Sequence, residues 1–150
     1  MQFFHDEVGY NYRLTNLQAA LGLAQMETLE TFITRKKEFY DRYVQALDGK
    51  NGYRILPFKE DVSRSNHWFY SLYLEDDRHK RDEVIGALKE ASIQARPVWA
   101  LIQEQADYGS CQAYSLEKAQ DYRARIVNLP CSTNLTQEDQ QRVIDLLLSL

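Results

Sequence analysis

One long segment with a helical period limits the folds that this chain can adopt. Its apolar residues recur mostly at steps of three, four or seven, at Leu17, Ala20, Leu21, Ala24, Phe32, Ile33, Tyr40, Val44 and Leu47. Thr15 and Gln18 match the S/T-x-x-Q capping box, and Gly49 and Gly52 follow the last apolar position. The pattern predicts a long amphipathic helix over 16–47, with small residues for close packing in its first half and a more exposed, charged second half.

The rest of the chain alternates between short strand and helix patterns. We predict strands at 53–66 (ending in a loop), 68–74, 92–99 and 126–130, and helices at 81–91, at 115–125 and after a second capping box formed by Thr136 and Asp139. Residues 100–112 are expected to be irregular or briefly helical. Pro97 limits its strand to a sheet edge or to the strand's own end.

This order of elements shows no doubly wound repeat and favours an α+β fold. We expect a long N-terminal helix and a small antiparallel or mixed sheet with helices on one face. We divide the chain into an interface loop with a long linking helix, residues 1–50, and a small C-terminal α+β domain, residues 51–150.

Charge and composition exclude some classes of protein. The 150 residues carry a net charge of -4, and the pI is about 5.4, so a nucleic-acid partner is not expected. The most basic run, Arg35-Lys36-Lys37, is followed by Glu38 and Asp41, and we interpret it as a solvated helix face.

The cysteines and the terminus favour a cytoplasmic protein. Cys111 and Cys131 lie far apart without a C-x-x-C pair, which predicts neither a zinc ribbon nor a disulfide framework. No apolar run approaches ~18 residues, so no membrane partner is expected. The first residues, MQFFHDEVGY, lack the basic region and long apolar core of a signal peptide.

Several common catalytic motifs are absent from the sequence. It contains no G-x-G-x-x-G fingerprint, no P-loop and no G-x-S-x-G elbow. His5, His67 and His79 do not pair at helical spacing, so no metal site is expected. The run His5-Asp6-Glu7 could bind a metal in principle, but a surface turn is the favoured interpretation.

The segment GYNYR, residues 9–13, is the first candidate site. Asn11 offers an amide, and Arg13 offers a planar guanidinium that suits a carboxylate or phosphate. Both precede the predicted start of a helix, where anions are favoured. The alternative is a loop whose tyrosines pack and whose Arg13 pairs with an acid of the same chain.

The segment ARPVW, residues 95–99, is the second candidate. Arg96 precedes a proline in a predicted strand, and Trp99 lies just beyond it. Such an arginine and aromatic residue can line a pocket. The alternative is an edge strand with an exposed arginine.

Three long segments resemble one known family. HDEVGYNYRLTNLQAALGLAQMETLETFITRKKEFYDRY is similar to a signature segment of the sugar-nucleotide aminotransferases of the DegT/DnrJ/StrS type. RDEVIGALKEASIQARPVW and IVNLPCSTNLTQEDQQRVIDLL resemble later segments of that family in the same order and spacing. The resemblance extends from His5 to about Leu147.

The resemblance implies a pyridoxal 5'-phosphate (PLP)-dependent enzyme of fold type I. Members move an amino group, usually from glutamate, to a keto group on a nucleotide-linked sugar, in surface-polysaccharide or deoxyaminosugar biosynthesis. Members are homodimers with active sites at the subunit interface. For this chain, the resemblance implies a homodimer formed through the loop and the long helix. The chain corresponds to the C-terminal part. The lysine that forms the Schiff base lies upstream in the family, so we assign no catalytic residue and expect this part alone neither to transaminate nor to retain PLP.

The resemblance also assigns binding roles. It places Asn11 at the PLP phosphate of the other subunit, with the same wall shaped by Tyr10, Tyr12 and Arg13. It places Arg96 and Trp99 near the sugar or the cofactor, and we take them as substrate-binding residues.

The chain departs from the family pattern at two places. Ser92 stands where many members have glycine, and Leu101-Ile102-Gln103 stands where many have a histidine. If that histidine binds substrate, this chain differs in its substrate or in the pose of that substrate. The RPVW form of this segment resembles the one found in the branch of the family that acts on UDP-linked 4-keto-6-deoxy-hexosamines. The alternative hypothesis for the whole chain is a non-catalytic dimerisation or interaction module derived from the family.

Overall fold

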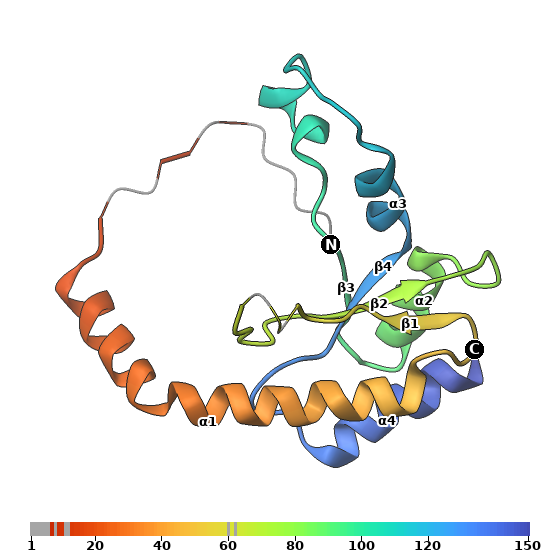
Figure 1. Ribbon diagram of the computed structural model, residues 1–150, viewed down its shortest axis with the longest axis horizontal. Coiled ribbons are helices and arrows are strands. Elements are labelled where there is room, and N and C mark those ends of the chain that lie inside the picture. Colours follow the sequence, from red (N-terminus) through yellow and green to blue (C-terminus); the bar gives the residue numbers. More distant parts are fainter. Residues whose placement is uncertain (1–6, 8, 11–12, 60, 62) are drawn as a thin grey trace.

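The fold is described from a computed structural model, which covers residue 7 and residues 9–10, 13–59, 61 and 63–150. In chain order, the elements are α1 (Asn16–Leu47), β1 (Tyr53–Ile55), β2 (Tyr70–Leu74), α2 (Arg81–Glu90), β3 (Arg96–Pro97), the 3-10 turns η1 (Ile102–Glu104) and η2 (Ala106–Tyr108), α3 (Glu117–Arg125), β4 (Ile126–Leu129) and α4 (Gln137–Ser149) (Figure 1).

The strands form one sheet in the order β1-β2-β4-β3, and every neighbouring pair is antiparallel. Leu72 of β2 pairs with Ile55 on one side and with Val127 on the other. Pro97 lies in β3 at the edge of the sheet, a position where strands tolerate a proline. The predicted fold class, a long helix with a small antiparallel sheet and helices packed on it, is confirmed.

One face of the sheet carries the hydrophobic core. Tyr70, Leu72 and Leu74 alternate along β2 and are buried, as expected for a strand with one face covered. The core also contains Tyr43 and Leu47 of α1, together with apolar residues of α2 and α4. Figure 1 shows α1 and α4 running side by side beneath the sheet.

The opposite face of the sheet is more polar and contacts α3. The Tyr73 ring meets the Tyr122 ring edge to face at 5.8 Å, and its hydroxyl donates to Asp121 at 2.7 Å. The guanidinium of Arg54 lies over the Tyr73 ring at 4.8 Å. Because successive side chains of a strand point to opposite faces, α3 lies on the side away from α1.

The ends of α1 agree with the sequence-based prediction. The Gln18 backbone N–H donates to the Thr15 hydroxyl at 3.3 Å, and the Gln18 side-chain oxygen accepts from the Thr15 N–H at 2.8 Å. This reciprocal pair is the predicted capping box. After the helix, Gly49 and Gly52 both adopt positive φ, which glycine tolerates without steric cost.

The prediction that the second half of α1 is its more exposed part is wrong. Its first half, expected to pack closely, is exposed, and its second half, expected to be exposed, supplies Phe39, Tyr43 and Leu47 to the core. These three residues follow one another at steps of four and therefore share one face of the helix. The charged residues between them lie on the other sides of the helix. The many charges of this half therefore led to a wrong prediction of exposure, although one face of it is buried.

Other predicted boundaries also shift. β2 begins at Tyr70, so Trp68 and Phe69 precede the strand instead of belonging to it. The strand expected over 92–99 shortens to β3, and α3 begins at Glu117. At the start of α4 the Thr136 hydroxyl accepts a hydrogen bond from the Asp139 backbone N–H at 3.1 Å and donates one to the Asp139 carboxylate at 2.9 Å.

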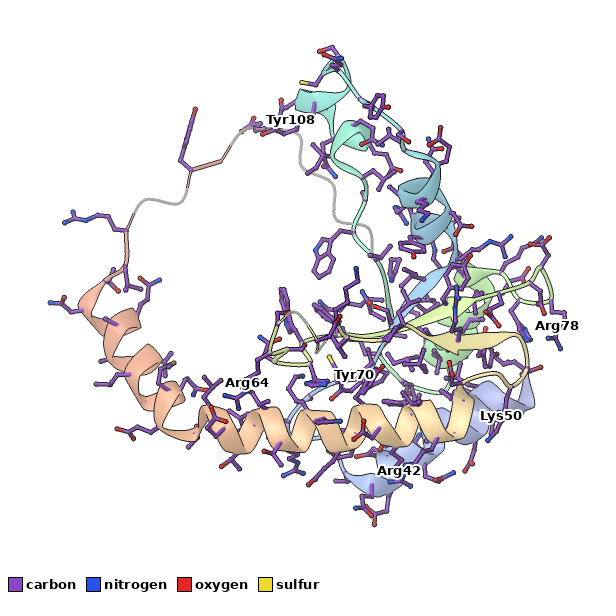
Figure 2. All side chains as sticks on the ribbon, viewed as in Figure 1. Arg42, Lys50, Arg64, Tyr70, Arg78 and Tyr108 are labelled. Atoms are coloured by element: carbon purple, nitrogen blue, oxygen red, sulfur yellow. The ribbon has the colours of Figure 1, made fainter. Side chains whose placement is uncertain are left out.

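Polar contacts join α4 to α1 and to β1. The buried Gln140 side chain donates to the Phe39 carbonyl at 2.7 Å, and Tyr53 donates to the Leu147 carbonyl at 3.0 Å. On the solvent side, Arg42 donates to the Gln141 side chain at 2.7 Å (Figure 2). These bonds hold α4 along the second half of α1.

Among the described residues, we find no helix that combines the length and apolar character needed to cross a membrane.

Replacing one leucine in each half of α1 by alanine tests the difference in burial between the two halves. Leu47 is 0% exposed and Leu21 is 63% exposed. We expect Leu47→Ala to lower the free energy of unfolding by about 2–5 kcal/mol, because it leaves a cavity in the core. We expect Leu21→Ala to change it by less than about 0.5 kcal/mol in the monomer. Urea unfolding followed by circular dichroism measures both, and equal losses would contradict the asymmetry.

Candidate functional site

A cavity of about 610 Å³ opens beside the middle of α1, where β2 begins and β4 ends. Four separate segments contribute to its wall: the middle of α1, the residues before β2, the residues leading into β3, and β4 with the loop that follows. The described lining residues are Leu29, Phe32, Ile33, Lys36, Asn66, Trp68, Phe69, Gln94, Arg96, Asn128, Leu129, Pro130, Cys131, Ser132 and Thr133.

The charged groups of this cavity are cations. Lys36 and Arg96 are its two charged residues among the described lining residues, and no acid is among them. Lys36 is half-buried, and its amine donates to the Cys131 carbonyl. Burial lowers the pKa of Lys36. The interpretation of Lys36 as part of a solvated helix face is therefore wrong, although Arg35 and Lys37 are exposed.

Cys131 lies in the same wall as these two cations. Burial raises the pKa of its thiol, while the positive charges of Lys36 and Arg96 act in the opposite direction. All three residues line this one cavity.

Asn128 adds an amide to the wall. It is buried in β4 and stands opposite Arg96 in the ladder between β4 and β3. Its side-chain oxygen accepts from the Ser71 hydroxyl at 3.2 Å, a bond that uses neither of its two donor hydrogens. A polar residue inside the apolar run IVNL was the sequence signal for this position, but the sequence analysis did not single it out.

Two aromatic residues, Trp68 and Phe69, line the cavity, and Trp99 packs against both. The Trp99 ring packs against Phe69 at 5.1 Å and against Trp68 at 5.9 Å, measured between ring centroids. Trp68 is 61% exposed and Trp99 is 45% exposed. The structure therefore brings the two residues predicted from ARPVW to one place, with Arg96 in the wall and Trp99 against the rim.

The described residues of the GYNYR segment do not line this cavity. Tyr10 and Arg13 are exposed, and neither lines the cavity. Arg13 comes two residues before the N-cap of α1, at the end of the helix that points away from the sheet (Figure 1). Asn11 and Tyr12 lie outside the described residues, as do His5 and Asp6 of the possible metal motif.

No cluster of three or more potential metal ligands occurs within the described ranges. Arg96 is the wall residue that the sequence analysis identified as a site residue; it did not identify the other described wall residues, among them Lys36, Asn128 and Cys131. Lys36, Asn128 and Cys131 come from α1, from β4 and from the loop after β4, and only the folded chain brings Lys36 to the other two.

Comparison with known proteins gives a consistent result. EpsN of Bacillus subtilis (strain 168) is 33% identical over 154 aligned positions, which cover 100% of this chain and 39% of EpsN. The GDP-perosamine synthase of Caulobacter vibrioides is 34% identical over 145 positions, covering 95% of this chain and 39% of that protein. The chain thus spans well under half the length of these relatives.

A solved structure shares the fold. The sugar aminotransferase CalS13 from Micromonospora echinospora superposes with a TM-score of 0.79 at 23% identity, over 94% of this chain and 37% of that one. The α+β architecture described above is therefore one found in sugar aminotransferases.

The family follows from the sequence as a whole. The model of the DegT/DnrJ/EryC1/StrS aminotransferase family matches residues 1–148. The chain belongs to this family, as its motifs indicated.

The two cysteines provide a test of the cavity wall. Cys111 is exposed, whereas Cys131 is half-buried with a raised pKa. Since the thiolate is the reactive form, we expect iodoacetamide to modify Cys111 faster than Cys131 at neutral pH. Lys36→Gln should slow the modification of Cys131 further, because it removes a positive charge that favours the thiolate. Peptide mass spectrometry measures both rates, and equal rates would contradict the described burial.

Proposed function

We propose that the protein containing this chain is a PLP-dependent aminotransferase. It moves an amino group, from glutamate in the expected case, to a keto group on a nucleotide-linked sugar for surface-polysaccharide or deoxyaminosugar biosynthesis. The observation that carries the proposal is the family match, because it includes both the GYNYR segment and the cavity wall. Relatives named as GDP-perosamine synthases support a nucleotide-linked sugar as substrate.

Features at the start of the chain fit the phosphate of PLP. Arg13 is exposed just before the N-terminus of α1, and both a guanidinium and a helix N-terminus favour a phosphate there. We infer that Asn11 donates its amide to this phosphate across a dimer interface, with Tyr10 and Tyr12 in the same wall. When bound, PLP supplies an electron sink at the carbon that carries the amino group.

The Schiff-base lysine is not assigned within this chain. No lysine here lies in a matching motif, and Lys36, the half-buried lysine of the cavity wall, donates to a backbone carbonyl. We infer that the reactive lysine comes from another part of the same protein. The role of residues 1–150 is to bind and position the cofactor phosphate and the substrate.

Homodimerisation is part of the same proposal. Leu17, Leu21 and Leu23 of α1 are exposed, and they do not share one face of the helix. A helix that is apolar on more than one side is normally covered in the complete protein. We infer that a second copy covers part of this half, with the loop of residues 7–15 beside it.

The proposal also assigns the two regions of the chain. Residues 1–50 serve as interface loop and linking helix, and residues 51–150 as the small domain that carries Arg96 and Trp99 to the substrate. We infer that the protein works in the cytoplasm, which fits two free cysteines.

Amino transfer by the whole protein tests the proposal. We expect 2-oxoglutarate to form from glutamate when a 4-keto-6-deoxy sugar linked to UDP, GDP or TDP is supplied together with PLP. Absence of product with all three nucleotide sugars and several amino donors would contradict an aminotransferase.

Replacing Asn11 tests the cofactor contact. We expect Asn11→Ala to weaken PLP retention by about 1–3 kcal/mol, because one hydrogen bond to the phosphate is lost. Cofactor absorbance after gel filtration of the whole protein measures retention. Asn134→Ala, at an exposed asparagine in the loop before α4, is the matched control and should retain PLP normally. Equal PLP retention in the two variants would contradict the proposed contact between Asn11 and the PLP phosphate.

The alternative is a dimerisation module without catalysis, and the exposed start of α1 is the observation that favours it. Light scattering of the whole protein measures dimer formation. We expect Leu21→Glu to weaken the dimer, and Leu148→Glu, at a partly exposed leucine of α4, to leave it intact. A dimer that depends on Leu21 but neither binds PLP nor transfers amino groups would favour the module. A dimer unaffected by Leu21→Glu would contradict the proposed interface.

A further inference from the structure

We propose that residues 98–125, the β3–β4 insertion, swing away from the rest of the chain and back onto it as one unit. The insertion leaves the sheet after β3, contains the turns η1 and η2 and the helix α3, and returns at the start of β4. Polar contacts around Arg125 hold the closed position that the structure shows. The inference goes beyond the proposed function, because the motion requires neither PLP nor a substrate.

The insertion contributes almost nothing to the hydrophobic core. All of its residues are described, and Gln105 is the only one of them that is buried. The partly buried apolar residues that pack against the core come from other segments as well. Figure 1 shows α3 and the two turns projecting from the sheet, away from α1 and α4. A segment with so little buried apolar surface can open at a small fraction of the free energy of global unfolding.

The two ends of the insertion lie next to each other. Pro97 of β3 pairs with Val127 of β4 in the antiparallel ladder, so the chain leaves the sheet and re-enters it at neighbouring positions. A few residues at such a junction can absorb the change of dihedral angles in a hinge motion. The insertion can therefore change its angle while both strands stay in the sheet.

Contacts around Arg125 attach the insertion to the end of β2. Nη2 of Arg125 lies 2.9 Å from the Asp77 carboxylate, and its Nη1 donates to the Leu74 carbonyl at 3.2 Å. Its Nε lies 3.1 Å from the Asp121 carboxylate, which also accepts from the Tyr73 hydroxyl at 2.7 Å. Both carboxylates are exposed to solvent, and ion pairs of that kind each contribute little to stability. The attachment therefore breaks far more easily than the core.

Arg123 makes the closed position less stable. Its side chain is largely buried, and its Nε lies 3.5 Å from the Glu104 carboxylate of η1, an ion pair without a hydrogen bond. Within the described part of the chain, its buried Nε and Nη1 atoms have no hydrogen-bond partner. A buried N–H group without a partner costs free energy, and water satisfies it once the surrounding contacts loosen. This cost reduces the free-energy difference between the closed and the open position.

Trp99 connects the motion to the cavity. It lies at the start of the insertion and packs against Trp68 and Phe69, which precede β2 and line the cavity. These ring contacts exist in the closed position and are lost as the insertion turns outward. The insertion thereby controls how far the aromatic part of the cavity wall is open to solvent.

Hydrogen–deuterium exchange of the whole protein, read by mass spectrometry, measures the opening. We expect the amides of α3 to have protection factors at least about tenfold lower than those of α4, a helix that supplies core residues. Added salt should raise the exchange rate of α3, because it screens the ion pairs of Arg125. The exchange rate of α4 should not change with salt to the same extent.

Two carboxylate replacements weaken the contacts around Arg125. We expect Asp121→Asn to raise the exchange rate of α3 about threefold or more, because it removes an ion pair and the charged acceptor of the Tyr73 hydroxyl. Asp77→Asn, at an exposed carboxylate, should act in the same direction with a smaller effect. Peptides that cover η1 should gain exchange together with α3, because the insertion moves as one unit.

A matched control removes an exposed ion pair elsewhere. Glu30→Gln breaks the pair between Glu30 of α1 and Arg64, and it should leave the exchange of α3 unchanged (Figure 2). Three results would overturn the inference: equal protection of α3 and α4, no change of α3 in either Asp121→Asn or Asp77→Asn, or an equal rise of exchange in α3 and α4. The last result would show that the replacements weaken the whole fold instead of releasing the insertion.

Discussion

The packing of the second half of α1 against the sheet is the contact on which the rest of the structure depends. Tyr43 and Leu47 are fully buried, the Tyr43 ring packs against Tyr70 of β2, and the Tyr43 hydroxyl donates to the Pro130 carbonyl after β4. The Tyr70 hydroxyl in turn donates to the Lys36 carbonyl at 2.7 Å. These contacts fix α1 to both central strands. They also place Lys36 at the mouth of the cavity and send the first half of α1 beyond the sheet (Figure 1).

The element types could be predicted because local signals agreed with one another. The capping box at Thr15, the apolar period of α1 and the glycines after it all gave the same helix, and its bounds are confirmed. The fold class followed from the order of short strands and helices. Pro97 was correctly placed at an edge because a missing N–H group is a local property that no tertiary contact can restore.

The packing of α1 and the cavity wall could not be predicted in the same way. Whether Leu21 is covered depends on what else lies beside it, which the helical period of one segment does not contain. Lys36 was assigned to solvent because its neighbours in sequence are charged, whereas its actual neighbour is the Cys131 carbonyl, 95 residues away. Arg96 and Trp99 were recognised through motif resemblance, but their aromatic partner Trp68 was assigned to a buried strand.

The form of α1 has a mechanical consequence for the protein. Its second half is clamped by the core, while its first half extends as one continuous helix toward Arg13. A helix segment of about 20 residues is about 30 Å long, so a tilt of about 5° at the clamped part moves the free end by roughly 2.6 Å. The helix therefore acts as a lever arm. A small change of angle around Tyr43 and Gln140 would displace the start of α1 and Arg13 far more than the cavity wall.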